Sequence, residues 1–91
     1  MPSRDVTIIN KLGMHARAAA KFVNLASSFE SQVEIEKASR RVNGKSIMGV
    51  MMLAAECGST ITLTVEGRDE EEASAALIAF LESETLEERT L

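Results

Sequence analysis

His15 and Arg17 are the residues of this sequence whose types and spacing best suit chemistry on an anion. They lie two positions apart at the start of a predicted helix, where backbone amides bind phosphate and a guanidinium adds charge-assisted hydrogen bonds. A neutral imidazole can accept a phosphoryl group directly, and Gly13 leaves room for a partner's backbone or a phosphate to approach. This helix start is therefore a candidate site for binding an anion such as a phosphoryl group.

Both residues also break local rules of helix formation. Ser, Thr, Asp or Asn would cap the helix better than His15, and Arg17 places a cation where the helix dipole favours anions. Local violations of this kind concentrate at functional sites. On these residues alone a structural role stays open, with His15 as a cap or surface residue, Arg17 as a solvated side chain and Gly13 as a turn.

Ser46 opens a second segment of interest, because it is a good N-cap for a short helix that is apolar all round. Methionine side chains are flexible and suit a surface that docks partners of different shapes. We predict that Ile47 and Met48 are exposed docking residues. The core side of this helix is expected to hold Val50, Met51 and Leu53. A plain core helix remains the alternative.

Apolar periodicity predicts the elements that position these residues. Apolar and polar residues alternate, as in strands with one buried face, around Val6–Ile8, around Val33–Ile35 and over Thr60–Glu66. A turn at Lys37–Ser39 brings Arg40–Val42 back as a hairpin. Helical spacing predicts three helices, one after His15, one from Ser46 to about Ala55 and one after Asp69.

Local signals mark the helix ends. Gly58 can supply a left-handed stop after the second helix. Asp69, followed three residues later by Glu72, is typical of a capping box that opens the third helix. The order βαββαβα predicts an α+β fold, an open-faced β-sandwich in which three helices cover one face of a four-stranded antiparallel sheet. We expect one domain over residues 1–91, with a core at about 4–84 and a polar tail at 85–91.

Composition excludes several classes of function. The net charge is −4, from 14 acidic and 10 basic residues, and no basic stripe suits nucleic acid. Cys57 is alone, so neither an internal disulfide nor a conventional zinc site is expected. No apolar signal region follows the N-terminus, and the longest nearly apolar run, 47–55, is too short to insert into a membrane. We expect a cytoplasmic protein with no metal and no cofactor.

Two stretches of the chain resemble one known family. The segment Gly13–Ala18 is similar to the active-site motif of the HPr phosphocarriers, and Lys45–Leu53 resembles their regulatory-serine segment at the matching spacing. The resemblance covers residues 4 to about 82. One departure is Ala18, where many members have proline. Alanine is a good helix former, so we expect only a less pre-set helix start.

The resemblance implies a phosphocarrier of the phosphoenolpyruvate-dependent phosphotransferase system and not an enzyme. Enzyme I would phosphorylate Nδ1 of His15, Arg17 would hold the phosphate, and an EIIA-type domain would receive it. The resemblance also implies that Ser46 is a regulatory phosphorylation site, for which an HPr serine kinase/phosphorylase is the candidate kinase. We expect the carrier to be a monomer. It leaves the sugar-uptake and the nitrogen-related branches both open.

Two other classes of function stay open at this point. One is a regulatory binding module that uses Ser46 and the methionines without relaying phosphate through His15, although such a module has no need of a nucleophile. The other is a small-ligand-binding α+β domain, which would need a concave polar pocket that the sequence does not locate.

Overall fold

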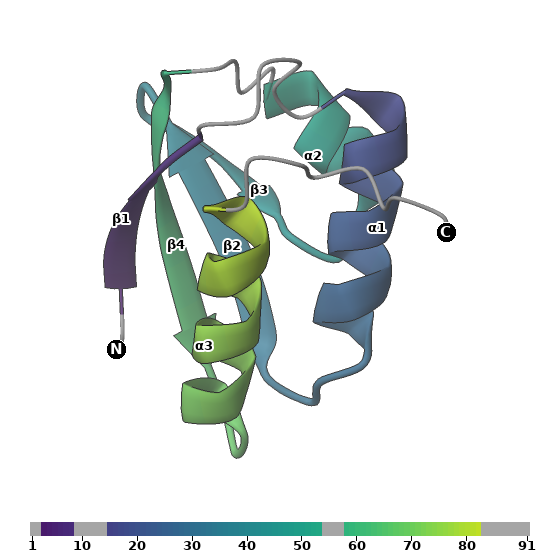
Figure 1. Cartoon of the computed structure of the whole chain (residues 1–91), viewed down its shortest axis with the longest axis vertical. Coiled ribbons are helices and arrows are strands. Elements are labelled where there is room, and N and C mark those ends of the chain that lie inside the picture. Colours follow the sequence, from purple (N-terminus) through teal and green to yellow (C-terminus); the bar gives the residue numbers. More distant parts are fainter. Residues whose placement is uncertain (1–2, 9–14, 54–57, 83–91) are drawn as a thin grey trace.

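The structure is a computed structural model, and it describes residues 3–8, 15–53 and 58–82. Within these ranges four strands and three helices follow one another in the predicted order (Figure 1). Their bounds are β1 Ser3–Thr7, α1 Ala16–Ser27, β2 Gln32–Lys37, β3 Arg40–Asn43, α2 Ile47–Leu53, β4 Thr60–Glu66 and α3 Glu70–Leu81. Residues 54 and 55, the predicted end of the second helix, and the tail from 85 lie outside the described residues.

The strands form one antiparallel sheet in the order β1-β4-β2-β3. β4, whose apolar and polar residues alternate most regularly, lies between β1 and β2. Val6 of β1 is opposite Ile61, and Ile35 of β2 is opposite Leu63. The hairpin between β2 and β3 turns at Ala38 and Ser39, which both have positive φ. The predicted open-faced sandwich is therefore confirmed.

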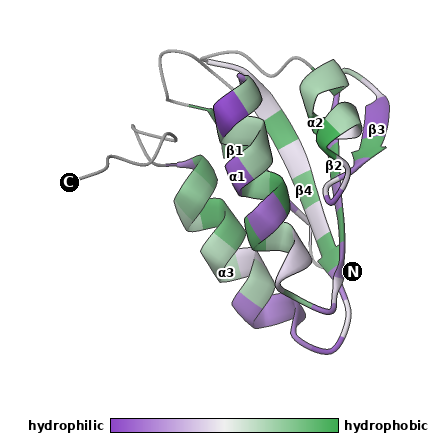
Figure 2. Cartoon of the chain, turned by 90° about the vertical axis from the view of Figure 1, so that its right-hand side faces the viewer, coloured by the Kyte–Doolittle hydropathy of each residue, from purple (hydrophilic) through white to green (hydrophobic). Residues whose placement is uncertain are grey.

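The helices cover one face of this sheet, as Figures 1 and 2 show from two sides. The inward residues of the strands and one stripe of each helix make a single core, since residues spaced by two in a strand and by three or four in a helix share a face. Phe22 of α1 and Phe80 of α3 meet above the sheet with ring centroids 6.2 Å apart. The fully buried large side chains are Val6, Ile8, Phe22, Val33, Ile35, Val50, Ile61, Leu63, Val65, Leu77 and Leu81.

The start of α3 differs from the prediction. Asp69 occupies the N-cap position, but its side chain makes no capping hydrogen bond. Its carboxylate instead accepts hydrogen bonds from the backbone amides of Glu30 and Ser31, at 2.9 and 3.0 Å, and from the hydroxyl of Ser31. The prediction of a capping box was therefore wrong. The loop after α1 packs against this turn, and its amides and hydroxyl donate hydrogen bonds to the Asp69 carboxylate in place of the helix amides.

Candidate functional site

His15 immediately precedes the first helical residue of α1, as predicted. Its backbone is extended (φ −75°, ψ 178°), and its carbonyl accepts the first helical hydrogen bond from the Ala19 amide at 2.8 Å. The imidazole makes no capping hydrogen bond to the helix. It is half-buried, and its Nε2 atom is shielded from solvent. His15 therefore ends the loop before α1 without using its side chain to complete the helix.

Arg17 is exposed in the first turn of α1, and this turn contains no acidic residue. The buried face of the same turn is formed by Ala18 and Ala19, which pack into the core. The position of family prolines is thus taken by a fully buried alanine. Gly13 lies outside the described residues. The helix dipole and the guanidinium together make this end of α1 attractive to an anion.

Ser46 caps α2, as predicted. Its hydroxyl accepts a hydrogen bond from the amide of Gly49 at 3.2 Å, and its carbonyl accepts one from the amide of Val50 at 2.9 Å. The preceding Lys45 extends its ammonium group to the carbonyl of Phe29, 2.8 Å away. The entry to α2 is therefore tied to the loop that follows α1, and the Ser46 side chain is half-buried.

Four apolar side chains of α2 face solvent. Their exposed fractions are 41% for Ile47, 67% for Met48, 44% for Met51 and 60% for Met52. We refer to these four residues as the α2 surface. Exposure of Ile47 and Met48 agrees with the prediction, whereas the placement of Met51 on the core side was wrong.

The geometry of a short helix explains the exposure of Met51. Successive residues are about 100° apart around an α-helix, and the two buried residues of α2, Val50 and Leu53, set the direction of the core. Met48 then lies almost opposite the core, and Met51 and Met52 flank it on the outer side. Sequence reasoning missed Met51 and Met52, although the pair Val50 and Leu53 would have shown this orientation.

Close packing fixes α2 in place. A side chain on Gly49 would bring a Cβ atom within 3.2 Å of the Val42 Cβ atom, so α2 lies unusually close to β3. Arg40, at the start of β3, donates a hydrogen bond from Nη1 to the Met52 carbonyl at 3.3 Å. A cation at the C-terminal end of a helix is favoured by the dipole.

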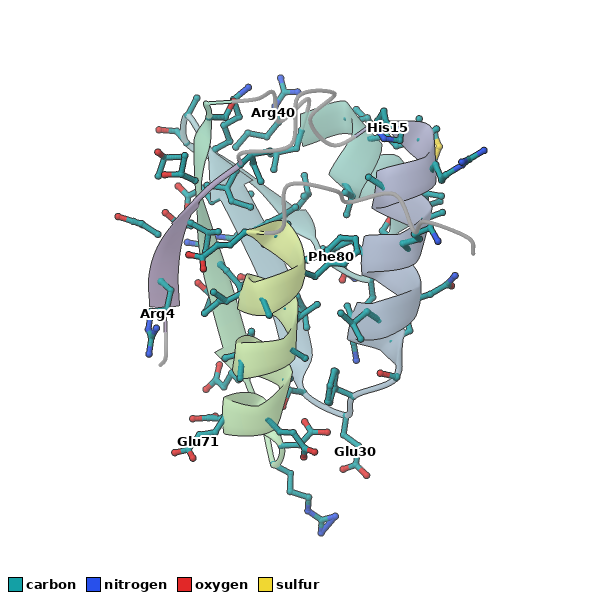
Figure 3. The ribbon with its side chains drawn as sticks, in the orientation of Figure 1. Arg4, His15, Glu30, Arg40, Glu71 and Phe80 are labelled. Atoms are coloured by element: carbon teal, nitrogen blue, oxygen red, sulfur yellow. The ribbon has the colours of Figure 1, made fainter. Side chains whose placement is uncertain are left out.

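The start of α1 and the α2 surface lie at the same end of the molecule. α1 and α2 pack against each other, and Figure 3 shows His15 beside α2. A different hollow, of about 620 Å³, lies between β1 and α3 and is lined by Arg4 and Ile78 among others. Figure 3 places Arg4 at the left edge of the molecule, across the sheet from His15 at the upper right. The predicted site residues are therefore brought together, and this hollow is separate from them.

No group of three or more His, Cys, Asp or Glu residues in the described ranges could hold a metal ion. None of the helices α1 to α3 is long and apolar enough to cross a membrane.

Comparison with known proteins defines the class. A family model described as the phosphorylation site of the HPr component of the phosphotransferase system matches residues 2–83. The phosphocarrier protein HPr of Cupriavidus necator is 59% identical over 81 residues, which are 89% of this chain and 91% of that protein. The HPr-like protein Crh of Halalkalibacterium halodurans is 54% identical over 84 residues, covering 92% of this chain and all of that one.

Solved structures agree with the sequence relatives. The crystal structure of HPr-C-His from Thermoanaerobacter tengcongensis matches with a TM-score of 0.90 and 48% identity, over 98% of this chain and 100% of that one. These findings define a phosphocarrier of the phosphotransferase system rather than a catalytic enzyme. The chain belongs to the HPr family, as its two motifs predicted.

Proposed function

We propose that this chain accepts a phosphoryl group from Enzyme I on His15 and passes it to an EIIA-type domain. The observation that carries the proposal is the placement of His15 directly before α1, beside the exposed Arg17, with an imidazole that is not used to cap the helix. Each transfer forms a bond from an imidazole nitrogen to phosphorus as the donor's bond to phosphorus breaks. Delivery to the EIIA-type domain reverses these events.

Nδ1 is the proposed acceptor atom. Nε2 is shielded from solvent, which supports transfer at the other ring nitrogen. Arg17 stabilises the negative oxygens through charge-assisted hydrogen bonds, and the dipole of α1 adds to this stabilisation. Ile47 and Met48 bind the partner proteins, since large exposed apolar side chains beside a polar site are typical of protein contacts.

One incubation tests the relay. Wild-type protein and His15→Ala are each incubated with Enzyme I and phosphoenolpyruvate, and the products are then treated with acid. We expect label on the wild type that acid removes, because phosphohistidine is acid-labile, and no label on the variant. His15 is the only histidine in the chain. Label on His15→Ala, or acid-stable label on the wild type, would show that the acceptor is another residue.

We also propose that Ser46 is a regulatory site for an HPr serine kinase/phosphorylase. A phosphate on Ser46 would place about −1.5 to −2 charges beside the α2 surface, which would repel an acidic face on Enzyme I. Phosphorylation of His15 is then expected to slow. The comparison is Ser46→Asp against wild type at low and high salt, with the melting temperature of each. An Asp variant that folds normally and accepts phosphate as fast as wild type at low salt argues against regulation by charge.

The purified Ser46-phosphorylated protein completes this comparison, because Asp carries less charge than phosphoserine.

A regulatory binding module without phosphoryl relay is the second candidate function. It is favoured by the same α2 surface, which could bind a partner without any use of His15. Under this alternative His15→Ala would bind its partner and respond to the Ser46 kinase as wild type does, while wild type would accept nothing from Enzyme I.

The proposal also covers where the carrier works, whether it is a monomer, and which branch of the phosphotransferase system it serves. We propose that the carrier works as a monomer in the cytoplasm, without a cofactor and without binding nucleic acid. Its transfer to purified EIIA-type domains distinguishes the branches. Faster delivery to a sugar-type domain would support a role in uptake, and faster delivery to a nitrogen-type domain would support a regulatory role.

A further inference from the structure

The α2 surface consists largely of methionine side chains that are exposed to solvent, a combination that is uncommon in folded proteins. Methionine is one of the residues most often buried in proteins, yet Met48, Met51 and Met52 all expose their side chains on one helix of two turns. The buried residues of α2 are Val50 and Leu53, so none of these thioethers is needed to fill the core. Figure 2 shows α2 as an apolar helix at the edge of the helical layer.

Exposure determines how a methionine reacts. Oxidation converts a flexible apolar thioether into a polar, chiral sulfoxide, and its rate follows the access of the oxidant to sulfur. A buried methionine reacts slowly and loosens the core when it does. On α2 the same reaction would leave the core side, Val50 and Leu53, unchanged, and would alter only the outer face.

We propose that Met48, Met51 and Met52 form an oxidation-sensitive site that switches partner binding by this carrier. The oxidant is hydrogen peroxide or another hydroperoxide. A sulfur lone pair attacks the terminal peroxide oxygen, and the sulfur–oxygen bond forms as the oxygen–oxygen bond breaks. The leaving hydroxide, or alkoxide from an organic hydroperoxide, takes the proton of the transferred oxygen to become water or an alcohol. Sulfur loses two electrons and the peroxide gains them. Methionine sulfoxide reductases with a thiol reverse the change.

The functional effect follows from the position of the three residues. α2 packs beside α1, whose first residue follows His15, so a partner protein bound over the imidazole also has the α2 surface within its reach. A sulfoxide dipole buried in that contact would lose water without gaining a matched partner. This inference rests on the proposed docking function of the α2 surface and adds a form of regulation to it.

The experiment compares wild type with a variant in which Met48, Met51 and Met52 are all replaced by leucine. Each protein is treated with hydrogen peroxide, freed of peroxide with catalase and reduced with dithiothreitol, which restores Cys57 but not methionine. Phosphorylation by Enzyme I is then measured against an untreated sample of the same protein. Leucine keeps an apolar surface of similar volume but has no sulfur to oxidise.

The expected result is an increase in the KM of Enzyme I for wild type of about tenfold, with kcat and melting temperature nearly unchanged, since loss of one strong interface contact has an effect of that size. The leucine variant should show no change on treatment. Incubation with methionine sulfoxide reductases should restore wild type. Trypsin releases the three methionines in one peptide, residues 46–68, and separates them from Met14, so mass spectrometry locates the oxygen.

Three outcomes would overturn the inference. They are a peptide 46–68 that stays unoxidised while Met14 reacts, an oxidised peptide with an unchanged KM, and a leucine variant that loses transfer as much as wild type. If the leucine variant does not fold, the recovery of wild type with the reductases remains decisive. Failure of the proposed function looks different, because untreated wild type would then accept no phosphoryl group on His15.

Discussion

Arg17 carries its charge at a place where a helix alone would not favour it. An exposed cation in the first turn of α1 opposes the dipole, and this costs about 0.3–1 kcal/mol of stability at low salt. A residue kept against its local preference is expected to act on something that binds there.

Arg17→Ala should therefore separate transfer from stability. We expect phosphoryl transfer to slow by roughly tenfold or more, because charge-assisted hydrogen bonds to the phosphoryl oxygens are lost. The free energy of unfolding in urea should stay within about 0.5 kcal/mol of wild type or rise slightly. Lys21→Ala, one helical turn further along α1, is the matched control. A large loss of stability with normal transfer would assign Arg17 to the fold instead.

Asp69 is a residue whose role depends on a contact far along the chain. The hydrogen bond from the Ser31 hydroxyl, followed by those from backbone amides, lowers the pKa of the Asp69 carboxyl below its ordinary value. A carboxyl whose pKa is lower in the folded protein contributes stability above the pKa that it has when unfolded. That contribution disappears as the pH falls through the folded pKa.

Asp69→Asn should remove this pH dependence. Unfolding by urea is measured between about pH 6 and pH 2, a range that spans the ordinary carboxyl pKa of about 3.9. Wild type should lose stability as the pH falls below about 4, and the variant should start lower and show a flatter slope. Glu72→Gln, an exposed carboxyl of the same helix, should retain the wild-type slope. Equal slopes for wild type and Asp69→Asn would place the dependence at other carboxyls.

Among the elements, α2 shows how short helices are oriented. Only Val50 and Leu53 of α2 are buried in the core. These two side chains and the close approach of Gly49 to β3 keep the helix in its orientation. We therefore expect substitutions on the inner and on the outer side of α2 to have different effects.

Val50→Ala should therefore lower mainly the stability of the protein, and Met48→Ala should weaken mainly its binding to Enzyme I. Loss of buried methyl groups at Val50 is expected to destabilise the protein by about 2 kcal/mol. Met48→Ala should change stability by less than about 0.5 kcal/mol but raise the KM of Enzyme I. Urea unfolding and transfer kinetics on both variants test this. If Met48→Ala leaves the KM unchanged, Met48 does not dock Enzyme I.

The turn between β4 and α3 contains Gly67, whose replacement can be predicted from its backbone conformation and its neighbours. Gly67 has φ 154°, and a Cβ atom there would lie 2.6 Å from the Ser31 Cα atom. Gly67→Ala should destabilise the protein by at least about 2 kcal/mol, because it adds backbone strain to a clash with the loop that Asp69 holds. Gly58→Ala is the control, since its φ is also positive but no atom lies within 4 Å of the added Cβ. A Gly67 variant no less stable than the Gly58 variant would show that strain, not contact, dominates.

At the scale of the whole molecule, most of the fold could be predicted from periodicity. Alternation in Thr60–Glu66 and helical spacing after His15 depend on local sequence, and both elements are where they were expected. The misplacement of Met51 and the wrong capping box at Asp69 have another cause. Each depends on which segment packs nearby, and that is fixed only when the sheet and helices assemble.

The site itself was partly predictable. The helix start at His15 and the cap at Ser46 are local features and are present as expected. Their gathering at one end of the molecule is not local, since it requires α2 to pack beside α1. The roles of His15, Arg17, Ser46, Ile47 and Met48 remain predictions for the experiments above.

The two outer strands of the sheet, β1 and β3, bear on how the protein behaves in concentrated solution. β3 is only four residues long and carries Arg40 and Arg41, and β1 carries Arg4 and Asp5. Short, charged edges discourage the addition of further strands and hence the growth of fibrils. Both edges of this sheet are therefore poor templates for strand addition, and we expect concentrated solutions of the protein to resist fibril formation.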